Sequence, residues 1–141
     1  MTSQELNKAV AEAMGWTEVE PQFNPKHYPA TPYYGKPPVM RMGLVRERIP
    51  NWAEDLGACA APGGPLAWLI EQVRKLDGGS VDLEMTIAPR NSYGKEAIEY
   101  RCIIRTYPDD FLGEGFGVKA GEAVCNAVLA VAAKLKEQGD V

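Results

Sequence analysis

Apolar residues recur at helical spacing near the start of the chain. One face of the predicted helix is formed by Leu6, Val10, Ala13 and Met14. Thr2 and Glu5 have the spacing of a capping box, in which the threonine side chain accepts a hydrogen bond from the first turn. Gly15 is a natural C-terminal stop. The pattern therefore predicts a short amphipathic helix that ends at Gly15.

The middle of the chain carries a second helical pattern, which is interrupted. Asn51 is expected to cap a helix that begins at Trp52. The run 61–65, Ala-Pro-Gly-Gly-Pro, breaks this helix, and the pattern restarts directly after it. The apolar face of the restarted helix is formed by Leu66, Leu69, Ile70, Val73 and Leu76. The glycine pair that follows Asp77 is expected to end it.

Between residues 81 and 105 the apolar residues follow the period of a strand instead. In the first run, polar residues alternate with Val81, Leu83, Met85 and Ile87. A second alternating run follows after a loop. One of its faces holds Ile98, Tyr100, Cys102 and Ile104, and the other holds Glu99, Arg101, Ile103 and Arg105. Two such runs, joined by a glycine-containing loop at 89–94, predict an antiparallel hairpin. One face of the hairpin is expected to meet helices and the other to be charged. A further strand is expected at 39–45.

The segment 21–38 carries six prolines, so an irregular coil is expected there. Phe23, Tyr28, Tyr33 and Tyr34 are interleaved with the prolines. Two interpretations remain open for these aromatic side chains. They anchor a coil wrapped over the core, or they form a rigid wall for a ligand or a second subunit, because proline lowers the entropy cost of ordering the segment.

The chain closes with a glycine-rich segment, expected as a turn, and a helix. The apolar stripe of this helix is formed by Val124, Ala127, Val128, Val131 and Leu135, and further alanines let it approach a sheet closely. The predicted order is helix, strand, helix, strand, strand, helix. The fold class is therefore α/β, with a small antiparallel sheet layered with helices in a single domain over 1–141.

Composition and charge narrow the class of protein. The net charge of −4 argues against stable binding to nucleic acid, and no apolar run is long enough to cross a membrane. The N-terminus lacks the basic patch and apolar core of a signal peptide. Cys59, Cys102 and Cys125 are far apart in the sequence and odd in number, so reduced, buried thiols in a cytoplasmic protein are expected.

The residues that catalysis or metal binding would need are not arranged in any familiar pattern. His27, the only histidine, lies in the proline-rich coil without a nucleophile at a recognisable spacing. The glycines of 113–117 precede a helix but lack the rest of a phosphate-binding motif. Asp82, Glu84 and Glu99 have no histidine to support a metal. No catalytic residue, metal or cofactor is expected.

Arginine and tyrosine side chains form the predicted ligand site. Its residues are Arg90, Asn91, Tyr93, Arg101 and Arg105 of the hairpin, with Tyr33, Tyr34 and Arg46 before it. Guanidinium groups donate forked hydrogen bonds to phosphates, and tyrosine rings stack on bases. In the alternative interpretation, Asp82 and Glu84 pair across the sheet with Arg101 and Arg105 on a solvated face.

Three stretches carry a resemblance to a known family. They are ELNKAVAEAMGW (5–16), IPNWAEDLGACA (49–60) and GEAVCNAVLAVAAKL (121–135), and in this order they resemble the phage ABA-sandwich domain, in which a sheet is layered between helices. The closing pattern is also similar to the end of a double-stranded-RNA-binding domain. Such a domain presents several lysines there, whereas this chain has Lys119 followed by Glu122.

The resemblance extends to small phage proteins of the Thoeris anti-defence type. These act as oligomeric sponges that bind cyclic ADP-ribose isomers, and some also hold cyclic oligonucleotides. By analogy, the chain is expected to be a phage-encoded homo-oligomer in the host cytoplasm that sequesters a nucleotide immune signal of the Thoeris or CBASS type without cleaving it. The alternative is a phage protein that inhibits a host protein by direct contact.

Overall fold

The computed structural model describes residues 2–38, 46–77, 83–91, 98–106 and 110–137. Its elements, in chain order, are α1 (Ser3–Ala13), β1 (Thr17–Pro21), β2 (Tyr33–Lys36), β3 (Glu47–Arg48), α2 (Leu56–Ala60), α3 (Pro65–Asp77), β4 (Leu83–Asn91), β5 (Ile98–Thr106), β6 (Asp110–Gly117) and α4 (Ala120–Glu137). The strands form two antiparallel sheets, ordered β1-β2-β3 and β4-β5-β6. The expected α/β fold with a small antiparallel sheet and helices is confirmed, with a second sheet in addition.

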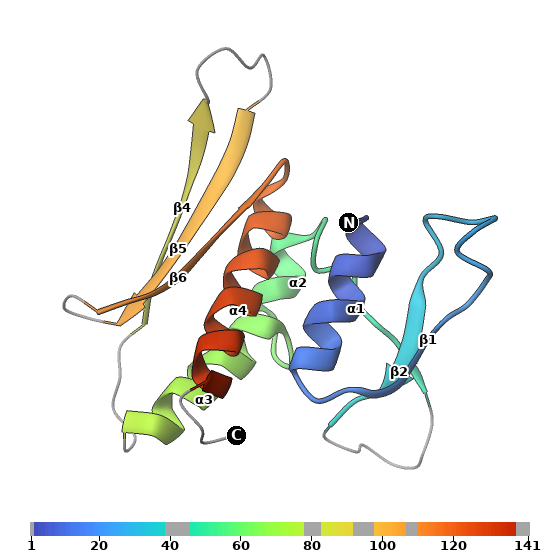
Figure 1. Cartoon of the computed structure of the whole chain (residues 1–141), viewed down its shortest axis with the longest axis horizontal. Helices are drawn as coiled ribbons and strands as arrows, with labels where there is room; N and C mark the ends of the chain where they lie inside the picture. Colours follow the sequence, from blue (N-terminus) through green and yellow to red (C-terminus); the bar gives the residue numbers. More distant parts are fainter. Residues whose placement is uncertain (1, 39–45, 78–82, 92–97, 107–109, 138–141) are drawn as a thin grey trace.

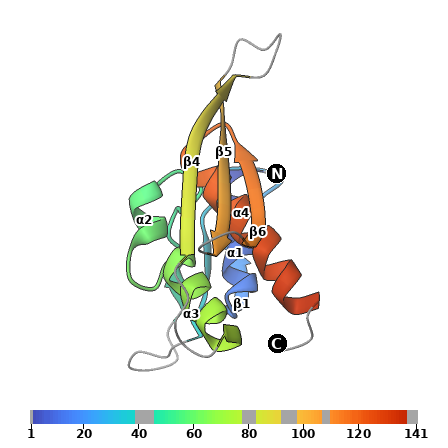
Figure 2. The ribbon, with the colours of Figure 1, turned by 90° about the vertical axis from the view of Figure 1, so that its left-hand side faces the viewer.

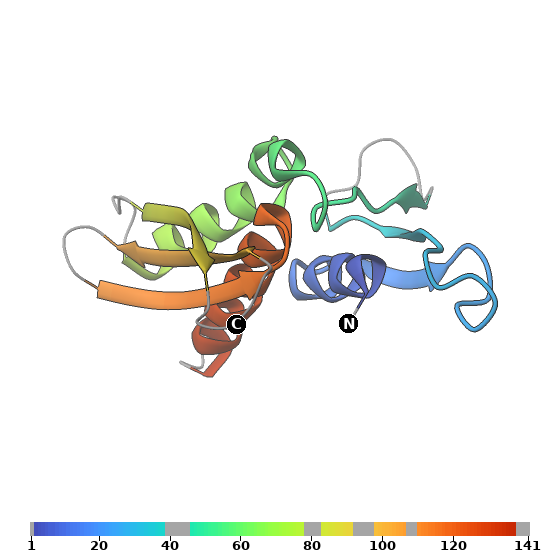
Figure 3. The same cartoon turned by 90° about the horizontal axis from the view of Figure 1, so that it is seen from above.

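Helix α4 lies at the centre of the molecule (Figure 1). It packs against β5 and β6 on one side and against α1 on another, and it also contacts α2 and α3. Seen from above, the β4-β5-β6 sheet, α4, α1 and the β1-β2 hairpin follow one another across the molecule (Figure 3). Figure 2 faces the outer side of the β4-β5-β6 sheet, with α4 behind it. Helices thus lie between two sheets, whereas the family resemblance implied a sheet between helices.

The hairpin expected from the alternating pattern is strands β4 and β5. Their register pairs Ile87 with Cys102 and Met85 with Ile104. Cys102 and Ile104 are buried against the helices, while Arg101 and Arg105 lie on the other face, as the alternation predicts. The period-two pattern therefore placed this strand pair and its inner face correctly.

The glycine-rich segment before α4 is a strand, not the expected turn. In β6, Gly113 and Gly115 pair with the buried residues of β5 and face α4. A Cβ on Gly115 would overlap the amide of Ala127 and lie 2.5 Å from the carbonyl oxygen of Ala123. Carbon contacts are optimal at about 3.5–4.0 Å, so only glycine lets the backbone of α4 approach the strand this closely. These glycines pack a helix on a sheet and do not form a phosphate-binding turn.

The proline-rich segment also holds more regular structure than expected. Pro21 ends β1, and Tyr33–Lys36 forms β2, so the coil predicted for 21–38 is irregular only between and after these strands. Neither strand has a proline in its interior, where the missing N–H would break a ladder hydrogen bond. The strand expected at 39–45 lies outside the described residues.

The helix ends follow capping chemistry, with one correction. The Thr2 side chain accepts a hydrogen bond from the Glu5 amide, and Gly15, at a φ of 98°, follows the C-terminus of α1, as predicted. Asp55, not Asn51, caps α2, which therefore begins after Trp52 instead of at it. The side chain of Asn51 is used elsewhere. None of the described helices is long and apolar enough to span a membrane.

Candidate functional site: a tryptophan pocket

The predicted arginine and tyrosine site is divided between the two sheets. Tyr33 and Tyr34 lie in β2 and Arg46 directly precedes β3, whereas Arg101 and Arg105 lie in β5 of the other sheet. Helices α4 and α1 lie between these sheets (Figure 3). The structure therefore does not bring the predicted residues together in one site.

Three further residues of the predicted site, Arg90, Asn91 and Tyr93, were expected in the turn of the hairpin. Arg90 and Asn91 lie in β4, where their backbones pair with Glu99 and Ile98, and not in the turn as expected. Tyr93 lies outside the described residues.

The two arginines of β5 have different surroundings. Arg101 donates two hydrogen bonds, at 2.8 and 2.6 Å, to the Glu114 carboxylate on β6, and its guanidinium lies 5.9 Å from the centre of the Phe116 ring. It therefore does form a cross-strand ion pair, with β6; the side chains of the expected partners, Asp82 and Glu84, lie outside those that the structure describes. Arg105 lies opposite Glu84 in the register, and its Nε is buried without a hydrogen-bond partner among the described residues.

Tyr33 and Arg46, the site residues expected near the coil, form contacts around the β1-β2-β3 sheet. Tyr33 is buried beneath the ammonium of Lys8, which lies 5.7 Å from the ring centre. Arg46 forms an ion pair of 2.9 Å with Glu20. The Tyr33 ring is therefore used within the fold, whereas the Arg46 pair is exposed at the surface.

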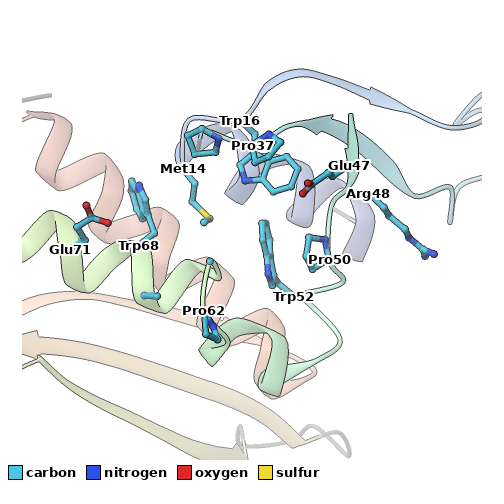
Figure 4. A pocket seen from close by; sticks show the side chains of 13 residues that line it. Met14, Trp16, Pro37, Glu47, Arg48, Pro50, Trp52, Pro62, Trp68 and Glu71 are labelled. Carbon is cyan, nitrogen blue, oxygen red and sulfur yellow. The ribbon is translucent and has the colours of Figure 1, made fainter. Parts of the chain in front are cut away.

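A pocket of about 460 Å³ opens elsewhere, between the first sheet and α3 (Figure 4). Its lining comes from the residues that follow α1 and β2, from β3 and the turn after it, from the link between α2 and α3, and from α3 itself. The lining residues are Met14, Trp16, Pro37, Pro38, Glu47, Arg48, Pro50, Trp52, Pro62, Gly63, Ala67, Trp68 and Glu71. A volume of roughly 300–1,000 Å³ with mostly apolar walls and a few polar groups is typical of sites for small organic molecules.

The three tryptophans of the chain all line this pocket. Trp16 and Trp52 are packed edge to face, with ring centres 6.2 Å apart and an interplanar angle of 82°. Both are largely buried, so they form the floor and hold it rigid, while the half-buried Trp68 supplies most of the accessible indole surface. An aromatic pair in this arrangement adds about 0.5–1.5 kcal/mol beyond burial alone.

Sharp changes of chain direction place the tryptophans. Gly15, at a φ of 98°, turns the chain from α1 into β1 and sets Trp16 against the core. Gly63, at a φ of 83°, does the same between α2 and α3, two residues before the helix that carries Trp68. Pro50 precedes the turn that holds Trp52.

A buried asparagine fixes the segment that carries Trp52. The side chain of Asn7 on α1 is fully buried, and its Oδ1 accepts a hydrogen bond of 2.8 Å from the amide of Ala53. Its Nδ2 donates a hydrogen bond of 2.9 Å to Oδ1 of Asn51. Because these partners satisfy a buried amide, the pocket floor is tied to α1 at a defined position.

A charged link continues this network to α4. Nδ2 of Asn51 donates to Glu54 at 2.6 Å, and Nζ of Lys119 donates to the same carboxylate at 2.5 Å. The hydrogen bond from Lys119, helped by the one from Asn51, lowers the pKa of Glu54, and the Glu54 carboxylate raises the pKa of Lys119. The pair is exposed, so it orients the turn more than it stabilises the fold.

Three cysteines, distant in the sequence, meet in the core behind the turn. Cys59 of α2, Cys102 of β5 and Cys125 of α4 are all fully buried, which confirms the expected burial. Burial raises the pKa of Cys102 to about 11, and a hydrogen bond with Cys59, together with burial, raises that of Cys125. The thiols of Cys102 and Cys125 are therefore poor nucleophiles, whereas the hydrogen bond with Cys125 lowers the pKa of the buried Cys59.

Among the described residues, no three His, Cys, Asp or Glu side chains are arranged to hold a metal ion. The groups that converge at the pocket are indole rings, proline rings and carboxylates, which suit binding by shape and stacking. Sequence reasoning did not place the tryptophans in the predicted site. A signal was present, because each tryptophan follows closely on a glycine or a proline, where a side chain often borders a turn.

Comparisons of the chain with protein-family models, with curated proteins and with solved structures gave no match.

Proposed function

We propose that the protein is a binding protein that holds a small ligand by a planar ring in the tryptophan pocket and releases it chemically unchanged. The observation that carries this proposal is the pocket of about 460 Å³ that gathers every tryptophan of the chain. Apolar cavities with a few polar groups are where proteins most often bind small molecules.

The rigidity of the pocket supports binding. Trp16 and Trp52 are packed against each other, and Asn7 holds the backbone beside Trp52 through two hydrogen bonds. A ligand that enters a preformed site loses less free energy to ordering of side chains than one that must organise the site.

The ligand class we favour is a nucleotide immune signal, a cyclic ADP-ribose isomer or a cyclic oligonucleotide, sequestered by a phage-encoded protein in the host cytoplasm. Such ligands carry bases that stack on indole rings, at about 1–3 kcal/mol for each base. The pocket accounts for the base but not for the phosphates, because Arg101 and Arg105 lie on the other sheet. Recognition of the base by indole rings therefore replaces the expected binding of phosphates by Arg101 and Arg105.

We also propose that the protein forms a homo-oligomer, and the support for this is one exposed pair of aromatic side chains. Trp16, Trp52 and Tyr33 are buried within one chain, so they offer little apolar surface to a second copy. Phe23 and Tyr28 remain, 52% and 59% exposed and packed on each other with ring centres 5.4 Å apart. Light scattering at micromolar concentration tests whether they hold two copies together; a strict monomer would remove the oligomer from the proposal.

The experiment that tests the function uses the tryptophans as reporters. Because every tryptophan lines the pocket, a bound ring should change the intrinsic fluorescence of the protein and raise its melting temperature. Ala67, exposed on α3 at the pocket wall, offers a substitution that narrows the pocket beside Trp68 without opening the core. Ala67→Leu should therefore abolish binding, while Arg101→Ala, on the far sheet, should bind as the parent does.

The fate of the ligand is checked in the same samples. Denaturation and chromatography after incubation should return the intact molecule, and a linear product would contradict a binding protein. If neither cyclic ADP-ribose isomers, cyclic oligonucleotides nor adenosine changes the fluorescence or the melting temperature, the proposed function is wrong.

The alternative, inhibition of a host protein by direct contact, is favoured by one observation. Phe23 and Tyr28 form an exposed aromatic pair in the link between β1 and β2, and aromatic side chains are enriched where proteins meet. The double variant Phe23→Ser, Tyr28→Ser should then abolish the effect on host defence, whereas Ala67→Leu should leave it intact. The opposite pattern is expected for ligand sequestration.

A further inference from the structure

We propose that the tryptophan pocket selects an organic cation, a planar ring or alkylammonium group that carries a positive charge, over a neutral ring of the same shape. This inference rests on the proposed function, because it names the charge of the ligand that the same pocket takes. It arises from two carboxylates, Glu47 and Glu71, among the lining residues.

The two carboxylates lie at opposite ends of the tryptophan group. Glu47, in β3, points its carboxylate toward the ring of Trp16, and Glu71 lies beside Trp68 on α3 (Figure 4). Among the described lining residues the only basic one is Arg48, and its guanidinium extends away from the three tryptophans (Figure 4). A ligand in the pocket would therefore meet indole rings and carboxylates, with the arginine turned outward.

Glu47 has no internal use in the described part of the chain. Its carboxylate forms no ion pair or hydrogen bond there, in contrast to Glu18, Glu54 and Glu114, each of which binds a lysine or an arginine. Glu71 has only a long contact of 3.7 Å to Lys75 at its own helix surface. Among the residues that the structure describes, at least one carboxylate beside the rings thus has no partner.

The combination has a defined chemical preference. The face of an indole ring is negative, so it attracts a cation within about 6 Å of its centre, and tryptophan does so best among the aromatic residues. A carboxylate at the edge of the same site adds Coulomb attraction, which grows as water is displaced. Phosphate groups are repelled by the same carboxylates, so a nucleotide would enter with a positively charged ring inward and its phosphates toward solvent.

Matched ligands that differ only in charge test this inference. The probes are 1-methylnicotinamide, which carries a permanent positive charge on its ring, and nicotinamide, which is neutral, with adenosine as a second neutral ring. We expect the cation to bind at least tenfold more tightly than nicotinamide by calorimetry. Glu47→Gln, which keeps the shape of the side chain, should remove most of this preference, while the control Glu12→Gln, exposed on α1, should retain it.

The outcomes separate the two proposals. If adenosine and nicotinamide bind as well as the cation, and Ala67→Leu abolishes all three, the pocket binds rings without selecting charge and this inference is wrong while the proposed function stands. The inference is equally wrong if only adenosine binds. If Glu47→Gln and Glu71→Gln both leave the preference unchanged, the carboxylates do not select the charge. Binding of none of the probes or signals overturns both proposals.

Discussion

A methyl group added at Gly115 should push the central helix away from its sheet. The Cβ of Gly115→Ala would overlap the amide of Ala127 and lie 2.5 Å from the oxygen of Ala123, both backbone atoms that no rotamer change can move. Restoring ordinary contact requires α4 and β6 to separate by about 1 Å, since such contacts are optimal near 3.5–4.0 Å.

The magnitude follows from this separation. A gap of about 0.5–1 Å forfeits roughly a quarter to a half of each dispersion contact, and β6 is a principal partner of α4. Overpacking of a core typically costs about 1–3 kcal/mol. Because the helix backbone itself is displaced, we expect the upper end of that range. The gain of about 0.4–1 kcal/mol that alanine brings by restricting the unfolded chain offsets only part of it.

Chemical denaturation and a thermal melt measure the effect. For a chain of this size, 1 kcal/mol corresponds to about 3–5 °C, so Gly115→Ala should melt about 6–12 °C below the parent. The matched control is Gly57→Ala in α2, where the new Cβ would meet a side-chain atom, Oδ1 of the capping residue Asp55, at 3.2 Å, so that the cap has to shift by only a few tenths of an ångström. That variant should change stability by less than about 1 kcal/mol in either direction. A Gly115→Ala protein as stable as the parent would refute the close approach of α4 to β6.

Further predictions concern the network behind the pocket. Asn7→Ala should lower the free energy of unfolding by about 1–3 kcal/mol in urea denaturation, because the buried amide of Ala53 loses its acceptor, whereas Gln4→Ala on the same helix should change it little. The lowered pKa of Glu54 means that its stabilising contribution is present above its ordinary value of 4.5 and is lost as the pH falls through the folded pKa, so Lys119→Gln should make the melting temperature less sensitive to acidification below pH 4.5. The raised pKa of Lys119 acts at the other end, where the contribution is lost as the pH rises beyond 10.5. The buried thiols of Cys59, Cys102 and Cys125 should react with a thiol reagent at pH 8 only after denaturation, and rapid labelling of the native protein would contradict their burial.

Local periodicity was enough to predict α1, α3, α4 and the β4-β5 hairpin, because each buries one regular face of its own. Strand β6 could not be predicted in this way. Its inner positions are Gly113, Gly115 and Gly117, which have no apolar side chain to show a period, since there the backbone itself is what packs. Close backbone packing at these positions therefore leaves no apolar pattern in the sequence.

For the candidate site, too, the sequence predicted the local orientation of residues but not which distant residues lie together. The alternation correctly placed Arg101 and Arg105 on one face of β5, but it carried no information about which sheet that face belongs to. The prediction that they share a site with Tyr33 and Arg46 was wrong, because the sequence does not show that helices separate the two sheets. The tryptophan pocket likewise exists only because three distant turns converge.

The central place of α4 has a consequence for how the molecule forms. Every element that α4 contacts precedes it in the chain, so during synthesis α1 and the β4-β5-β6 sheet emerge before their common partner does. Contacts between α1 and α4 join segments near the two ends of the described chain, and such distant contacts form slowly because a long loop must close first. Until then the inner face of the sheet, with its row of glycines, stays open to other strands and to chaperones. The nascent chain is therefore most exposed to aggregation just before residues 120–137 appear.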